Sequence, residues 1–467
     1  MRLLPAVLAF LGIFSFTSVT ALADHHTSEH AKKAFEIYKH IVEIDSSKTT
    51  GGAPKVAHYL ASELIAAGFP EGDVQVVMTE GVPALIARFR GDGSSGKKPI
   101  LVIGHMDVVE ANPADWERAP FSLTEDDNYF YGRGSVDNKF GVAQATATFI
   151  RLKKEGFVPN RDLYLAFSGD EESGMISTRM LAARPDLLEA GFALNTDAGG
   201  GDLDPSGKAV TYAVQAAEKT YATWEMTATN PGGHSSRPRP DNAIYDLADA
   251  ITRIQAHHFP VRWSKMTLDY FRETGQQLGG ELGQAMLAFA ANPEDKAASD
   301  RLEVESSYVG STRTTCVVTM LRGGHAENAL PQSATATVNC RIFPGVSMAH
   351  IEQELKRIVA NDKLDFKLIS DLIESPISET RADVMAAVAK AVHGRYPGVK
   401  IIPYMESGGT DGMHFRTNGV PTWGISGLFM DPDEMYAHGL NERAPKAGFY
   451  GALDHWSIIL KALAGGK

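Results

Sequence analysis

Apolar runs typical of buried strands alternate with amphipathic helical patterns over roughly the first half of this chain. The strand-like runs include PALIARFRG, PILVIGHMDVV, DLYLAFSGDEE and FALNTD, whereas helical patterns cover 31–68, 138–154 and 176–188. Strands that alternate with helices in this way build a sheet with helices packed on its faces. The sequence therefore predicts an α/β domain with a mixed sheet flanked by helices.

A second domain is predicted where this pattern changes, near Glu218. From there the order is strand, helix, strand, strand, helix, strand, which indicates a small α+β sandwich. A helix-rich stretch over 263–304 interrupts this order, and the first pattern resumes near Ser375. Because 467 residues are too many for one ordinary core, we predict a first domain over 24–217 and 375–467. The second domain is then inserted as 218–374.

The amino terminus has the pattern of a signal peptide. Arg2 precedes an apolar run over 3–16, and Ala21 and Ala23 supply small residues at the positions that a signal peptidase reads. The apolar run is short for a transmembrane helix, although an uncleaved membrane anchor is the alternative interpretation. We expect removal of 1–23 and a secreted or periplasmic protein without stable membrane association.

Two cysteines, Cys316 and Cys340, each lie inside a strand-like run. Export makes oxidation possible, and an even number of cysteines fits one pair. Adjacent strands could bring the two thiols within bonding distance. We therefore expect a disulfide at these positions in preference to a metal site or a catalytic thiol.

Acidic and histidine residues concentrate at the carboxyl ends of the predicted strands of the first domain. Open α/β sheets place their ligand sites at this edge. A single aspartate there is usually a turn or cap residue, and a single histidine is more often structural than a ligand. Seven such residues together point to a functional site: His105, Asp107, Asp137, Glu171, Glu172, Asp197 and His438.

These side chains suit a pair of zinc ions. Zinc binds imidazole nitrogen and carboxylate oxygen, and catalytic zinc sites keep a position open for water. Two histidines and three carboxylates suffice for two ions when one carboxylate bridges them, and such a pair polarises a carbonyl group. Asp107 lies two residues after His105 and could orient its imidazole. Of Glu171 and Glu172, one could bind metal while the other contacts the water.

Five motifs in a fixed order give the sequence a family resemblance. GHMDVV, GRGSVDNKFG, FSGDEESG, NTDAGG and PGGHSS resemble motifs of the dizinc peptidase family of glutamate carboxypeptidases, aminoacylases and acetylornithine or succinyl-diaminopimelate deacylases. The resemblance covers essentially the whole chain after residue 23. It implies a zinc-peptidase-like catalytic domain with an inserted lid or dimerisation domain.

The resemblance also implies the roles of the residues in these motifs. The implied zinc ligands form two sets that share one residue: His105, Asp197 and Asp137 for one ion, and Glu172, His438 and Asp137 for the other. Cobalt or manganese could replace zinc. Glu171 would be the general base, and the Asp137–Asn138 peptide bond would be cis.

The implied substrate contacts come mainly from the inserted domain. His234 would stabilise the oxyanion of the tetrahedral intermediate by reaching across from a partner subunit, which makes a homodimer possible. Arg341 would bind a substrate carboxylate through two parallel hydrogen bonds. Asn328, Gly408 and Gly409 would line the substrate pocket. An ordinary loop histidine and a surface arginine are the alternative interpretations of His234 and Arg341.

These observations together predict an exported dizinc exopeptidase of carboxypeptidase or dipeptidase type. It would hydrolyse an amide bond next to a free carboxylate with zinc-bound hydroxide and Glu171 as the base. An aminoacylase acting on N-acyl amino acids would use the same metal centre, and a non-catalytic peptide- or metal-binding protein would not need Glu171. The sequence GISGL around Ser426 lacks the spacing of a serine hydrolase. The net charge of −12 argues against nucleic acid as a partner.

Overall fold

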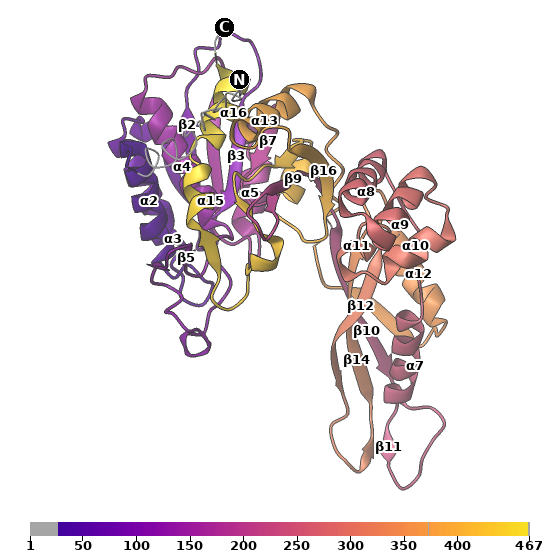
Figure 1. The fold of residues 1–467 in the computed structure, drawn as a ribbon. Coiled ribbons are helices and arrows are strands. Elements are labelled where there is room, and N and C mark those ends of the chain that lie inside the picture. The colour runs from indigo at the N-terminus through magenta and orange to yellow at the C-terminus, as the bar shows by residue number, and fades with distance from the viewer. Residues whose placement is uncertain (1–26, 372, 466–467) are drawn as a thin grey trace, which may run out of the picture.

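The computed structural model describes residues 27–371 and 373–465, which form two lobes (Figure 1). One lobe contains a large sheet with helices on both faces, and the other is elongated and extends away from it. The predicted signal peptide, 1–23, lies outside the described residues. Within those residues, no helix combines the length and the apolar character that crossing a membrane requires.

The first lobe is built on a ten-stranded mixed sheet, which confirms the predicted fold class. The strand order is β1-β2-β6-β3-β7-β17-β9-β8-β18, and β16 also pairs with β9. In its centre, β3 is parallel to β6 on one side and to β7 on the other. The bounds are β1 Val74–Thr79, β2 Val82–Phe89, β3 Ile100–His105, β6 Leu163–Ser168, β7 Phe192–Asn195, β8 Gly200–Leu203, β9 Ala209–Glu218, β16 Lys400–Glu406, β17 Thr422–Gly424 and β18 Phe429–Met430.

Alternate residues of the central strands pack on opposite faces of this sheet, as strand geometry requires. Leu163, Leu165 and Phe167 belong to the larger core, whereas Tyr164 and Ala166 belong to the smaller one. The larger core is completed by α2 Glu29–Val42, α3 Ala53–Ala66, α4 Lys139–Lys154, α13 Ala382–Arg395, α15 Lys446–Gly451 and α16 His455–Ala464. The smaller core is completed by α5 Ile176–Ala183, α6 Pro185–Leu188 and α14 Gly412–Thr417.

A small three-stranded sheet and three short 3₁₀ helices complete the first lobe in the described part of the chain. The sheet joins β19 to β5 and β5 to β4. It therefore connects the loop before α4 to the last part of the chain. The bounds are β4 Thr124–Glu125, β5 Tyr129–Tyr131, β19 Arg443–Pro445, η1 Glu71–Asp73, η2 Pro113–Asp115 and η3 Pro432–Glu434.

The inserted lobe contains a four-stranded antiparallel sheet in the order β12-β14-β10-β15, with α7 and α12 packed against each other on it. Its elements follow the predicted order. The bounds are β10 Thr220–Thr229, α7 Ala243–Gln255, β12 Thr315–Gly323, β14 Ser333–Ile342, α12 Met348–Val359 and β15 Leu364–Leu368. Cys316 and Cys340 are register partners on β12 and β14 and form a disulfide, which confirms that prediction.

The helix-rich stretch predicted over 263–304 forms three helices, and a short fourth helix follows it; together they have a small core of their own. That core contains Phe271, Met286 and Phe289, all fully buried. The first of these helices, α8, packs against β16 of the ten-stranded sheet, so the stretch touches both lobes (Figure 1). The bounds are α8 Lys265–Leu278, α9 Gly280–Ala291, α10 Lys296–Glu303 and α11 Ser306–Val309.

Candidate active site

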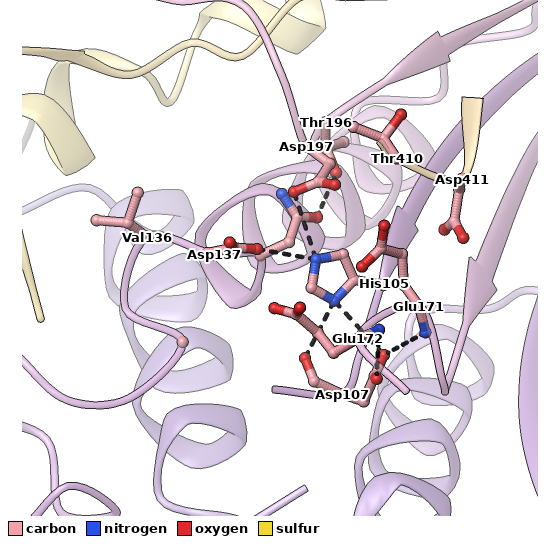
Figure 2. Close-up of polar contacts among 12 residues, drawn as sticks. His105, Asp107, Val136, Asp137, Glu171, Glu172, Thr196, Asp197, Thr410 and Asp411 are labelled. Atoms are coloured by element: carbon pink, nitrogen blue, oxygen red, sulfur yellow. Dashed lines mark hydrogen bonds and ion pairs between the residues drawn. The ribbon is translucent and has the colours of Figure 1, made fainter. Parts of the chain in front are cut away.

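Three adjacent parallel strands deliver the predicted site residues to one edge of the sheet (Figure 2). His105 is the last residue of β3, Asp197 follows β7 by two residues, and the Glu171–Glu172 pair follows β6 by three. Because β6, β3 and β7 are neighbours with the same direction, their carboxyl ends meet at this edge. The predicted clustering of these residues therefore follows from the strand order.

His105 is buried and aims one ring nitrogen at two carboxylates. Its Nε2 lies 2.9 Å from Oδ1 of Asp137 and 3.4 Å from Oδ1 of Asp197. Its Nδ1 lies 3.1 Å from the backbone carbonyl oxygen of Asp107, which fixes the ring. The sequence predicted that the carboxylate of Asp107 would orient the imidazole, but the closer contact is to its carbonyl. A histidine held in this way leaves Nε2 free for a metal.

The Asp107 carboxylate instead fixes the loop that carries the two glutamates. Its Oδ1 accepts a hydrogen bond from the backbone N–H of Glu171 at 3.0 Å, and its Oδ2 accepts one from Glu172 at 3.0 Å. The two hydrogen bonds are drawn in Figure 2. Asp107 therefore links the end of β3 to the loop after β6.

Asp137 lies between the two histidines. Its Oδ1 faces His105, and its Oδ2 lies 3.1 Å from Nε2 of His438. The same nitrogen of His438 lies 2.7 Å from Oε1 of Glu172. The peptide bond from Asp137 to Asn138 is cis, as the family resemblance implied. The two oxygens of one carboxylate thus face two separate groups of ligands.

These groups suit two divalent metal ions that share a bridging carboxylate. In the described residues, ligand atoms within 4.8 Å of one another come from three sets: His105, Asp137 and Asp197; Asp137, Glu172 and His438; and His105, Glu171 and Glu172. The first two sets share Asp137. Imidazole and carboxylate together are the usual ligands of zinc and related ions. Burial, together with the negative charge of nearby Asp137, raises the pKa of the Asp197 carboxyl to about 8. Bound cations would compensate this concentration of carboxylates.

Glu171 lies next to both groups and is nearly buried. Burial raises the pKa of its carboxyl well above the ordinary value, and nearby Asp197 and Asp411 raise it further. Its carboxylate oxygen lies within 4.8 Å of ligand atoms of His105 and Glu172. Glu171 therefore places a carboxyl of raised pKa beside the candidate metal ligands.

A buried glutamate that the sequence analysis did not single out holds the loop of Asp137. Glu442 accepts hydrogen bonds from the backbone N–H groups of Gly134, Val136 and Asp137 at 2.8–3.1 Å. It also pairs with Arg133 at 2.7 Å. The only sequence signal for Glu442 is its position four residues after His438.

The loop with Gly408 and Gly409 lines the same cavity of about 410 Å³ as Asp137, Glu171 and His438. A fully buried ion pair between Glu218 and Arg416 supports this loop, because Glu218 also accepts a hydrogen bond from the backbone N–H of Thr410.

Arg341 lies beside this loop, near the carboxyl end of β14. Its Nη1 lies 3.4 Å from the carbonyl oxygen of Ser407, and its guanidinium stacks over the Tyr221 ring at 4.7 Å. The structure therefore brings Gly408, Gly409 and Arg341 to the side of the candidate site.

His234 and Asn328 lie elsewhere, at the end of the inserted lobe. His234 is in β11 Gly233–His234, which pairs with β13 Ala329–Leu330, and the next residue, Ser235, donates a hydrogen bond to the carbonyl oxygen of Asn328. Figure 1 shows β11 at the tip farthest from the catalytic sheet. His234 is exposed there, so it does not reach the metal-ligand cluster of its own chain.

Two further histidines, His325 and His414, differ in their surroundings. His325 is exposed in the loop before β13, whereas His414 is buried on α14. Neither belongs to the groups of candidate metal ligands in the described residues.

Comparisons with known proteins agree with this geometry. Residues 101–462 match the family described as Peptidase family M20/M25/M40. N-fatty-acyl-amino acid synthase/hydrolase PM20D1 of Homo sapiens is 28% identical over 355 residues, which are 74% of this chain and 70% of that protein. Aminoacylase-1 of Sus scrofa is 28% identical over 373 residues, 78% of this chain and 80% of that protein.

The fold is also that of solved structures. A metallo-carboxypeptidase of the M20 family, Sso-CP2 from Sulfolobus solfataricus, superposes with a TM-score of 0.71 at 21% sequence identity. That match covers 93% of this chain and 99% of the other. The family match begins before His105 and ends after His438, so it includes every candidate metal ligand. This chain therefore belongs to peptidase family M20/M25/M40, a family of metallopeptidases and related amidohydrolases.

Proposed function

We propose that this protein hydrolyses the amide bond that joins an acyl group to an amino acid with a free carboxylate. The first candidate is an exopeptidase that releases a carboxy-terminal amino acid from a short peptide. The observation that carries this proposal is the shared carboxylate of Asp137, which faces His105 on one side and His438 on the other. Nearly buried Glu171 lies beside them.

The metal ions in this proposal are two zinc ions, for which cobalt or manganese could substitute. His105, Asp137 and Asp197 would hold one ion, and Asp137, Glu172 and His438 the other. When bound, such a pair acidifies water and polarises the carbonyl group of the substrate.

Glu171 takes the proton of the attacking water and returns it to the nitrogen of the leaving amine. Burial raises the pKa of its carboxyl, which favours acceptance of the proton from water before the leaving amine receives it. Asp107 positions Glu171 through its hydrogen bond to the backbone N–H. Water thereby adds across the amide bond and yields a carboxylic acid and an amine.

Arg341 binds the free carboxylate of the substrate. A planar guanidinium matches a carboxylate with two parallel hydrogen bonds, and this one lies against the loop that lines the metal-ligand cavity. Gly408 and Gly409 form part of that cavity wall and leave room for the substrate backbone. This contact would restrict the enzyme to substrates with an unblocked carboxyl end.

His234 and Asn328 complete the site from a second subunit. Their place at the tip of the inserted lobe separates them from the cluster of the same chain, so their use at the site requires a homodimer. The imidazole of His234 would then stabilise the negative oxygen of the tetrahedral intermediate. We further propose that the protein is exported after removal of 1–23, on the basis of its amino-terminal pattern.

A second candidate function is hydrolysis of N-acyl amino acids. Two relatives, at 28% identity each, are named as an N-fatty-acyl-amino acid synthase/hydrolase and as an aminoacylase. Both reactions cleave an amide on the amino side of an amino acid, so they need the same metals, base and carboxylate contact. The candidate functions differ only in the group that supplies the carbonyl.

The test is an assay of amine release by the purified zinc-loaded protein. Dipeptides with free and amidated carboxyl ends are compared with a set of N-acetyl amino acids. Turnover of free dipeptides alone supports the exopeptidase, and turnover mainly of N-acetyl compounds supports the aminoacylase. Equal turnover of amidated dipeptides would contradict the role of Arg341. Failure to cleave any of these with two zinc ions bound would favour a binding protein instead.

A further inference from the structure

A second cavity, of about 610 Å³, adjoins the cavity of the candidate metal site. The two cavities share four lining residues: Gly199, Tyr404, Leu428 and Met435. Gly199 comes two residues after Asp197, a candidate metal ligand. The volume lies within the range of about 300–1,000 Å³ that small-molecule pockets occupy. The two cavities are therefore neighbours that share part of their lining.

One wall of the cavity is the edge of the catalytic sheet, and the other is the helical stretch α8–α11. The sheet contributes residues of β8, β9, β16 and β18, including Val210 and Ile402. The helical stretch contributes Tyr270, Thr274 and Leu278 from α8, together with Tyr308 from α11. The helix-rich stretch of the inserted lobe therefore completes the cavity.

The helical wall is held firmly against the sheet. Lys400 at the start of β16 pairs with Glu273 of α8 and donates a second hydrogen bond to Gln276 at 3.1 Å. Behind the wall, Gly275 and Gly283 bring α8 and α9 close together, since a Cβ at Gly275 would lie 2.7 Å from the carbonyl oxygen of Gly283. The cavity is thus a feature of the packed fold, which favours a preformed binding site.

The lining of the cavity is mainly apolar and aromatic. Leu278 is 52% exposed and Met435 is 50% exposed, although both are large apolar side chains. Apolar residues that border a cavity and remain in contact with water are typical of a binding site for an apolar group. No lysine or arginine is among the described lining residues, and the only carboxylate is Asp202.

Asp202, on β8, is the carboxylate of the cavity lining. It follows Gly199, which lines both cavities, by three residues, or about 10 Å in an extended chain. Burial raises the pKa of its carboxyl to about 6. The lining thus combines extensive apolar and aromatic surface with a single carboxylate among the described residues.

We propose that this cavity binds an unbranched apolar chain on the acyl side of the scissile amide. The proposal rests on the proposed function, in which Arg341 binds the carboxylate of the leaving amino acid. The acyl part is then the part of the substrate whose length can vary without changing that contact. The chain is either the fatty chain of an N-acyl amino acid or the apolar side chain of an amino-terminal residue.

The experiment measures kcat/KM against chain length in two series with alanine as the leaving amino acid. One series is N-acyl-alanines from acetyl to decanoyl, and the other is X-Ala dipeptides in which X is alanine, norvaline, norleucine or lysine. Burial of each methylene predicts a rise of about fourfold in kcat/KM until the cavity is filled. The series with the steeper rise identifies the source of the chain.

Thr274→Trp fills the cavity from α8 and is expected to abolish this rise. Turnover of N-acetyl-alanine or Ala-Ala should remain within about threefold of wild type, because Thr274 is not among the residues that line the metal-site cavity. Leu278→Glu, at an exposed position, is a second variant that cannot disturb a core. Arg272→Trp, on the same helix but outside the cavity, is the matched control and should keep the full rise.

Three results would overturn the proposal. One is a flat chain-length profile in the wild-type protein, and another is an unchanged profile in both cavity variants. The third is a tenfold preference for lysine over norleucine at X, because it would assign the cavity to a cation that pairs with Asp202. Turnover of N-acetyl-alanine and Ala-Ala tests the proposed function separately from the role of the cavity. Calorimetric titration of the same series into Glu171→Gln tests the cavity even when turnover is absent.

Discussion

Glu442 and Arg133 form a buried ion pair, at 2.7 Å, that joins the two loops carrying Asp137 and His438. The guanidinium of Arg133 also donates hydrogen bonds to the carbonyl oxygens of His438 and Gly439 at 3.2 and 3.1 Å. Residues more than 300 positions apart in the chain are thereby fixed on either side of the metal-ligand cluster. The geometry of the cluster depends on this pair, although neither residue is a candidate ligand.

Glu442→Gln should destabilise the fold and weaken metal binding together. The substitution leaves the Arg133 charge buried without its partner, a change that typically costs about 3–5 kcal/mol. Urea denaturation and zinc analysis of the purified variant measure the two effects. Glu434→Gln is the matched control, because Glu434 pairs with Arg443 in a partly exposed position and should cost less than about 1 kcal/mol. Equal stability of the two variants would contradict this account.

Glu171→Gln should reduce kcat by about a hundred- to ten-thousandfold, which is the range for loss of a general base. Its zinc content should stay near that of the wild type, because the proposed function makes Glu171 the base and assigns the ions to the two groups that share Asp137. Glu172→Gln, one residue later, should instead lose zinc. Metal analysis alongside the amine-release assay separates the two outcomes. Wild-type turnover by Glu171→Gln would refute the proposed mechanism.

His414 should make the protein less stable as the pH falls from about 6.5 to about 4. Burial, with the charge of Arg179 nearby, lowers the pKa of His414 to about 4. The unfolded chain binds a proton near pH 6.5, so the folded state loses stability over this interval as pH decreases. Relative to His414→Leu, wild type should lose about 2–3 kcal/mol of unfolding free energy between pH 7 and pH 4.5. Parallel pH profiles from urea titrations would contradict this assignment.

The sequence was sufficient to predict the parts of the site that sit at strand ends. His105, Asp197 and the two glutamates follow apolar runs long enough to be recognised as buried strands, and parallel strands place such residues together. The order of elements in the inserted lobe was predicted for the same reason, since its strands and helices have clear periodicity. Local pattern and simple sheet geometry together fix these features.

Other features depend on contacts between distant parts of the chain and carry no local signal. Glu442 looks like an ordinary loop residue until the fold brings it to the backbone of Gly134 and Val136. Strands β8 and β9 were not predicted, because β8 is Gly-Gly-Asp-Leu and much of β9 is alanine. The contact of α8 with β16, which creates the second cavity, likewise depends on tertiary packing.

Arg341→Met should remove the preference for substrates with a free carboxyl end. Methionine keeps apolar contact with Tyr221 but cannot make the charged hydrogen bonds, whose loss typically costs about 1.5–3 kcal/mol. The kcat/KM for a free dipeptide should fall by about ten- to a hundredfold, whereas that for its amide should change little. Arg322→Met, which removes an exposed pair with Glu225 on the same sheet, is the control. A preserved ratio of free to amidated substrate in Arg341→Met would exclude this role.

The variants His234→Ala and Glu171→Gln should restore each other's activity only when they form a mixed dimer. His234→Ala and Glu171→Gln should each retain under about 1% of wild-type activity, because each removes a group from every site. In a mixed dimer, one site receives an intact Glu171 from its own chain and an intact His234 from the partner. Random mixing of the two variants should therefore restore about a quarter of wild-type activity, since half of the dimers are mixed and each has one complete site.

The measurement is amine release after the two variants are mixed, dissociated in mild denaturant and returned to buffer. Mixing without dissociation is the control and should restore nothing on the same timescale. The tip position of β11 is the reason for this expectation, because it leaves His234 exposed and remote from its own cluster. Analytical ultracentrifugation must show a dimer under the assay conditions. A monomer with full activity, or a His234→Ala variant as active as wild type, would remove His234 from the mechanism.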